Sequence, residues 1–107
     1  MEITVERLRA CLGSSPIFHV LMRIFRETHE LKAPATVLLD VAEHEKILSM
    51  AGEMKTKPGS FVEACFGRLV CCDAEDASVA FQRVTGLWVA VIGGACAPSV
   101  ILEKKER

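Results

Sequence analysis

Residues 60–72 read SFVEACFGRLVCC, and this stretch decides the predicted fold. Two apolar runs, 60–66 and 69–72, flank Gly67-Arg68, a pair that is typical of a turn. We therefore predict a β-hairpin whose two strands are these runs. Successive side chains of a strand point to opposite faces of the sheet, so Glu63 is expected to lie on one face of the first strand.

The elements predicted on either side complete a β-α-β-β-α-β order between Ala35 and Ile92. In chain order they are a strand at 36–39, a helix capped by Asp40, the hairpin, a helix capped by Asp73 and ended by Gly86, and a strand at 87–92. This order defines the ferredoxin-like topology, an antiparallel four-stranded sheet with two helices on one face. The predicted fold class is therefore α+β.

The remaining segments extend this core at both ends. Apolar residues at helical spacing predict two helices, 4–12 and 16–31, before the first strand. Residues 99–102 predict a last strand at the edge of the sheet. The 107 residues are expected to form a single domain, divided into a helical arm at 1–32, an α+β core at 33–103 and a charged tail at 104–107.

The composition favours an oligomer. Half of the residues are hydrophobic, which is rich for a short chain: either the core is dense, or some apolar surface is kept for a partner. On the second helix, Phe18, Met22 and Phe25 widen the apolar face, so we predict that they contribute to an interface with a second copy or another protein subunit.

Charge and cysteine usage narrow the class of protein. Thirteen basic residues against fourteen acidic ones give a net charge of −1, so nucleic acid is not an expected partner. No apolar stretch reaches the roughly 20 residues that span a bilayer, so no membrane partner is expected. The five cysteines are odd in number and lie mostly in apolar runs, which predicts reduced thiols in a cytoplasmic protein.

Few residues are candidates for binding a metal or another ligand. Adjacent strand residues point apart, so Cys71 and Cys72 are not expected to converge on a metal, and no metal site or cofactor is predicted. The loop with Gly93, Gly94 and Cys96 is the candidate ligand-binding element, because glycines let a ligand approach the backbone. The single tryptophan, Trp88, could stack on a base. It has no basic neighbour in the sequence and is predicted to lie in the core.

Residues 47–84 also resemble the bacterial microcompartment shell domain, a variant of the ferredoxin-like topology. In that family a helix rich in alanine and methionine ends in a lysine at the hexamer edge, and Met50-Ala51-Gly52-Glu53-Met54-Lys55 is similar. The family's strand, pore loop and strand correspond to the predicted hairpin around Gly67. The resemblance implies that Lys55, or alternatively Lys57, lies at an oligomer interface.

These observations lead to a non-catalytic, self-associating domain that acts as a structural, shell-like or accessory subunit. The alternative is a small-ligand-binding regulatory module that uses the Gly93 loop. An RNA-binding protein is less favoured, because the sequence shows no basic stripe. A thiol-dependent enzyme that uses Cys96 is also less favoured, because no cationic partner for that thiol is evident in the sequence.

Overall fold

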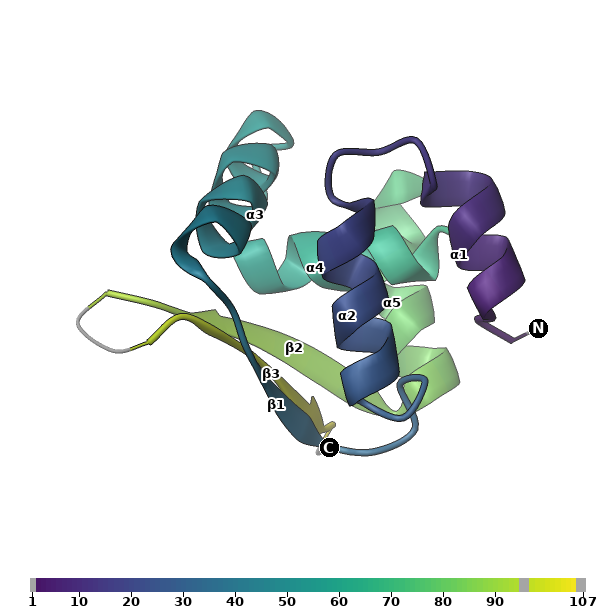
Figure 1. Cartoon of the computed structure of the whole chain (residues 1–107). Coiled ribbons are helices and arrows are strands. Elements are labelled where there is room, and N and C mark those ends of the chain that lie inside the picture. The colour runs from purple at the N-terminus through teal and green to yellow at the C-terminus, as the bar shows by residue number, and fades with distance from the viewer. Residues whose placement is uncertain (1, 95–96, 106–107) are drawn as a thin grey trace.

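The computed structural model describes residues 2–94 and 97–105 and shows an α+β fold (Figure 1). The chain order of its elements is α1 (Val5–Leu12), α2 (Phe18–Glu27), β1 (Ala35–Leu38), α3 (Val41–Glu53), α4 (Pro58–Gly67), α5 (Ala74–Thr85), β2 (Leu87–Ile92) and β3 (Ser99–Lys104). The predicted fold class is confirmed at this level. None of the described helices combines the length and the apolar character needed to cross a membrane.

The three strands form an antiparallel sheet in the order β1-β3-β2. Val37 pairs with Val100, and Val89 pairs with Leu102. These four side chains are buried because they face the helices, which lie on one side of the sheet in Figure 1. The fold is thus two-layered, with the described helices on the inner face of the sheet.

The segment 58–67, predicted in large part as a strand, is helix α4, so the predicted hairpin is wrong. Pro58 occupies the first turn of this helix, where its missing N–H group costs nothing. A short run that is apolar on most sides fits a buried helix as well as a buried strand, since it shows neither the helical nor the strand period. The described residues therefore contain three strands instead of the four of the ferredoxin-like topology.

The last strand also differs from its prediction. β3 was expected at the edge, but it lies at the centre of the sheet, between β1 and β2. It forms a hairpin with β2 and uses its other edge to pair with β1. This placement leaves β1 and β2 as the two edge strands.

The part of the chain that resembles the shell domain is helical. Residues 47–84 run from α3 through α4 into α5. The expected strand, loop and strand around Gly67 are replaced by the end of α4 and the turn that follows it. Lys55 lies just beyond α3, exposed and with a φ of 56°.

One hydrophobic core connects all the elements. Phe25 of α2, Phe66 of α4 and Phe81 of α5 are fully buried, and the Phe66 ring centroid lies 6.4 Å from that of Phe25 and 6.0 Å from that of Phe81. Leu8 and Leu21 of the predicted helical arm belong to the same cluster. The arm is therefore an integral part of the core.

Helix α2 ends at Glu27, four residues earlier than predicted. His29, Glu30 and Leu31 follow with φ values of 53°, 61° and 65°, a conformation unfavourable for residues other than glycine. The buried hydroxyl of Thr28 donates to the Ile24 carbonyl and accepts from the Leu31 N–H. Burial of Leu31 in the core accompanies this turn and helps to offset its strain.

Candidate functional site

Helix α4 covers the free edge of β2 through a buried carboxylate. Glu63 is 3% exposed. One of its oxygens, Oε2, accepts from the backbone N–H of Val89 at 2.7 Å. The other, Oε1, accepts from the Ser78 hydroxyl and from Nε2 of Gln82, the latter at 3.0 Å. The carboxylate thus joins α4, α5 and β2 with three hydrogen bonds.

Two glycines let α4 approach so closely. A Cβ atom on Gly59 would lie 2.3 Å from the Val89 carbonyl oxygen, and one on Gly67 would lie 1.7 Å from the Ala77 carbonyl oxygen. With Glu63 they occur at positions i, i+4 and i+8, which lie on one face of a helix. This face fits against the edge of β2 and the backbone of α5.

Arg23 contacts the opposite edge of the sheet. Its Nη2 donates to the Leu38 carbonyl at the end of β1, at 2.8 Å, and its Nη1 pairs with Glu43. The guanidinium also contacts Glu27 within α2. These contacts, the hydrogen bond to Glu43 first among them, raise the pKa of Arg23 above its ordinary value. Both edge strands therefore have a side chain from a helix on their outer edge.

The outer face of the sheet carries two exposed apolar side chains, Leu38 and Ile92, and two that are partly buried, Ala90 and Ile101, while Ser99 between the exposed pair is buried. In one cross-strand row Ile92 lies beside Ser99 and Leu38; in the next, Ala90 lies beside Ile101 and Thr36. Leu38 is 63% exposed and Ile92 is 42% exposed. We refer to Leu38, Ala90, Ile92 and Ile101 as the apolar sheet patch.

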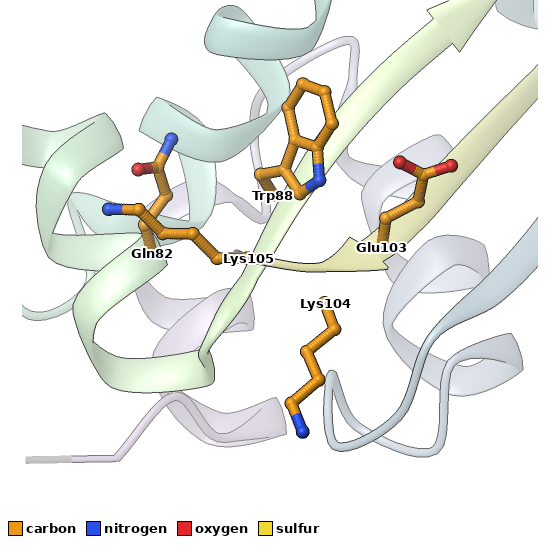
Figure 2. Close-up of a pocket in the computed structure, with 5 residues that line it drawn as sticks. All are labelled: Gln82, Trp88, Glu103, Lys104 and Lys105. Carbon is orange, nitrogen blue, oxygen red and sulfur yellow. The ribbon is translucent and has the colours of Figure 1, made fainter. Parts of the chain in front are cut away.

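A third row of the same face borders an open pocket of about 610 Å³. Trp88 pairs with Glu103 across β2 and β3, and its side chain is 44% exposed. The pocket is lined by Gln82, Trp88, Glu103, Lys104 and Lys105 (Figure 2). The expectation that Trp88 lies in the core is wrong. The antiparallel register places Glu103 opposite it, and the residues at the end of β3 bring Lys105 to the same pocket.

Two of the three predicted ligand-binding residues, Gly93 and Gly94, directly follow β2. Gly94 has a φ of 88°, as a tight turn requires, and a Cβ atom on Gly93 would lie 2.2 Å from the His44 ring. Packing and turn geometry therefore account for both glycines. Cys96 lies outside the described residues. A ligand role for this loop stays a prediction.

The predicted interface residues are divided between the core and the surface. Met22 and Phe25 are buried in the chain's own core, and Phe18 packs partly buried against it. Lys55 is exposed. Sequence reasoning did not identify Glu63 or Gln82 as partners, although the i, i+4, i+8 spacing of Gly59, Glu63 and Gly67 is a helical signal.

The thiols and histidines form no metal centre within the described part of the chain, where no three His, Cys, Asp or Glu side chains gather. Cys11 and Cys72 are exposed, and Cys65 is buried. Burial raises the pKa of Cys65 to about 11, against a smaller opposing effect from Arg68. That thiol is therefore protonated at neutral pH.

Comparison of the chain with protein-family models, with curated proteins and with solved structures finds no match in any of the three. Function is therefore inferred from the residues and their geometry.

Proposed function

We propose that the chain is a self-associating structural or accessory subunit, and that two copies pack through the apolar sheet patch. The observation that carries this proposal is the position of Leu38, Ala90, Ile92 and Ile101 on two adjacent rows of one uncovered sheet face. Apolar patches of a few hundred Å² are common on soluble proteins and are often functional. The proposal assigns no catalytic step to the chain.

The sheet edges favour a face-to-face contact over strand addition. Glu63 occupies the Val89 N–H on one edge, and Arg23 occupies the Leu38 carbonyl on the other. A further strand would have to displace these groups before it could pair. Two sheets that pack face to face, about 10 Å apart, need no such displacement.

The two rows of the apolar sheet patch carry no charged side chain, so the patch can pack against the same patch of a second copy. Ser99 and Thr36 are the polar members, and the rest are apolar. An isologous twofold contact would place apolar atoms against apolar atoms without like-charge repulsion. Three strands about 4.8 Å apart give a patch of roughly 200–300 Å² per copy, well below the ~800 Å² of a standard interface. We therefore expect a weak dimer.

Sedimentation equilibrium between about 5 and 500 μM tests the proposal, because a weak interface has a dissociation constant in or above the micromolar range. We expect a concentration-dependent rise from monomer towards dimer mass. Ile92→Lys should leave a monomer across the range, because it places a charge within the patch.

Val79→Lys is the matched control, since Val79 is 46% exposed but lies on α5, away from the sheet face. This variant should dimerise as the unchanged chain does, and circular dichroism should show that both variants are folded. A chain that is monomeric at all concentrations contradicts the proposal. Equal dimerisation of the two variants contradicts the assignment to the patch.

That the chain acts as a shell-like subunit, and that it is located in the cytoplasm, are predictions that form part of this proposal. Four described cysteines, including the exposed Cys11 and Cys72, are free thiols, which is compatible with a reducing compartment. The shell-like form draws on the resemblance of residues 47–84, which here are mainly helical. A hexamer in the sedimentation experiment would favour that form over a twofold dimer.

A further inference from the structure

The pocket beside Trp88 combines a flat apolar surface with charges of both signs. Its volume of about 610 Å³ falls in the range of small-molecule sites. Trp88 is 44% exposed, so part of the indole ring is available to a planar ligand. Figure 2 shows Gln82 and Lys105 on one side of the indole, and Glu103 on the other.

The amide of Gln82 is oriented by a buried partner. Its Nε2 donates to Oε1 of Glu63 at 3.0 Å, and this hydrogen bond orients the amide. The carbonyl oxygen is consequently turned away from Glu63. Because Glu63 is itself held by Ser78 and Val89, the acceptor on Gln82 is fixed before any ligand arrives.

The two charged walls specify different parts of a ligand. Glu103 lies directly across the strands from Trp88 and offers a carboxylate that accepts from N–H groups beside the indole. Lys105 extends towards Gln82 on the other side, whereas Lys104 points away from it (Figure 2). A matching ligand therefore has a planar ring with an N–H edge and an anionic group beyond the ring.

We propose that this pocket binds a free purine mononucleotide, and that guanosine monophosphate has the best-matched chemistry. The base stacks on Trp88, as bases stack on exposed aromatic side chains. Two neighbouring N–H donors of guanine face the Glu103 carboxylate, and the phosphate is held by the Lys105 ammonium. The proposal does not depend on self-association, because Trp88 and Ile92 lie two rows apart on the sheet.

Nuclear magnetic resonance of the indole N–H tests the site directly, since the chain contains one tryptophan and gives one such signal. The experiment uses the full chain carrying Ile92→Lys, so that a shift cannot come from dimer formation. Guanosine monophosphate is the probe. We expect a saturable shift in the millimolar to micromolar range, a several-fold weaker effect of guanosine, and no shift with inorganic phosphate.

Adjacent lysines provide the matched variants. Lys105→Gln should weaken binding of guanosine monophosphate roughly three- to tenfold and leave guanosine unchanged, because it removes only the phosphate contact. Lys104→Gln makes the same change of charge one residue away and should have little effect. Glu103→Gln should reduce the preference for guanosine monophosphate over adenosine monophosphate.

The absence of a saturable shift up to about 10 mM nucleotide would overturn the proposal, since such binding would be weaker than any specific site of this size. Equal losses in the two lysine variants would overturn the role of Lys105 and leave only general electrostatic attraction. A guanine hexanucleotide that bound more tightly than the mononucleotide would overturn the assignment to a free nucleotide. Dimerisation of the unchanged chain is measured separately and decides nothing about this pocket.

Discussion

Strand β2 has a free edge and an outer face in addition to the edge that pairs with β3. The free edge is covered by a helix, whereas the outer face is open. Its free edge is covered by α4, with Glu63 bonded to Val89 and Gly59 against the same residue. Its outer face carries Trp88, Ala90 and Ile92 and is left uncovered by the described helices. Covered edges prevent open-ended strand addition, whereas an uncovered face permits a closed contact between two sheets.

Among the substitutions that test this comparison, Glu63→Ala should cause the largest loss of stability. The substitution leaves the buried N–H of Val89 without a partner, removes two further hydrogen bonds to the carboxylate, and creates a cavity between α4, α5 and β2. We expect the free energy of unfolding to fall by roughly 3–5 kcal/mol. Urea denaturation followed by circular dichroism measures this loss.

Glu63→Gln is the control, because it keeps the volume and one carbonyl acceptor. It should lose clearly less stability, on the order of 1–2 kcal/mol. If alanine and glutamine cost the same small amount, the hydrogen bonds of Glu63 do not hold α4 on the edge. In that case the contrast between covered edge and open face would rest on packing alone.

Gly67→Ala tests the packing of the same helix. The new Cβ atom would lie 1.7 Å from the Ala77 carbonyl oxygen, so the backbones of α4 and α5 must move apart. We expect a loss of about 2–3 kcal/mol in the free energy of unfolding, as for other overpacked sites. Thermal or urea unfolding of the variant measures it.

Gly52→Ala is the matched variant at an uncrowded helical position, since a Cβ atom there meets nothing within 4 Å. It lies in α3 and is exposed, so alanine should raise the free energy of unfolding by up to about 1 kcal/mol through helix propensity. Opposite signs for the two variants separate close packing from propensity. A loss of similar size at both positions would show that the two helices do not differ as described.

The elements predicted correctly are those whose ends are marked by capping residues or turns in the local sequence. The capping box of Asp40 and Glu43 is formed as expected, and Gly86 ends α5 with a φ of 71°. Strand β2 also has its predicted bounds, 87–92. In each case, the deciding interaction is within a few residues of the chain, or the apolar run is followed by a turn.

The errors fall where the deciding interaction is distant in sequence. Residues 60–66 are mainly apolar and show no clear period. Helix α4 is held in place by contacts of Glu63 with Val89, 26 residues away, and of Gly67 with Ala77. The pocket beside Trp88 depends on the register that pairs it with Glu103. Contacts between residues so far apart in the sequence, such as Glu63 with Val89 and Trp88 with Glu103, cannot be identified from spacing along the chain.

The smallest effect concerns two thiols, one buried and one exposed. Burial raises the pKa of Cys65, on α4, from an ordinary value of about 9 to about 11, whereas Cys72 lies exposed beyond that helix. Because the folded pKa is raised, the protonated thiol favours the native state, and this contribution is present in full below pH 9. It is lost progressively as the pH rises from about 9 to about 11.

At pH 10 the expected loss in the free energy of unfolding is on the order of 1 kcal/mol relative to pH 7, because the unfolded chain releases the proton first. Urea denaturation at the two pH values measures it, and Cys65→Ala should reduce the difference between them even though the variant is less stable at both. The same dependence in Cys65→Ala would assign the alkaline loss to other groups. A thiol reagent at neutral pH should then still distinguish the two thiols, by modifying Cys72 before unfolding and Cys65 only after it.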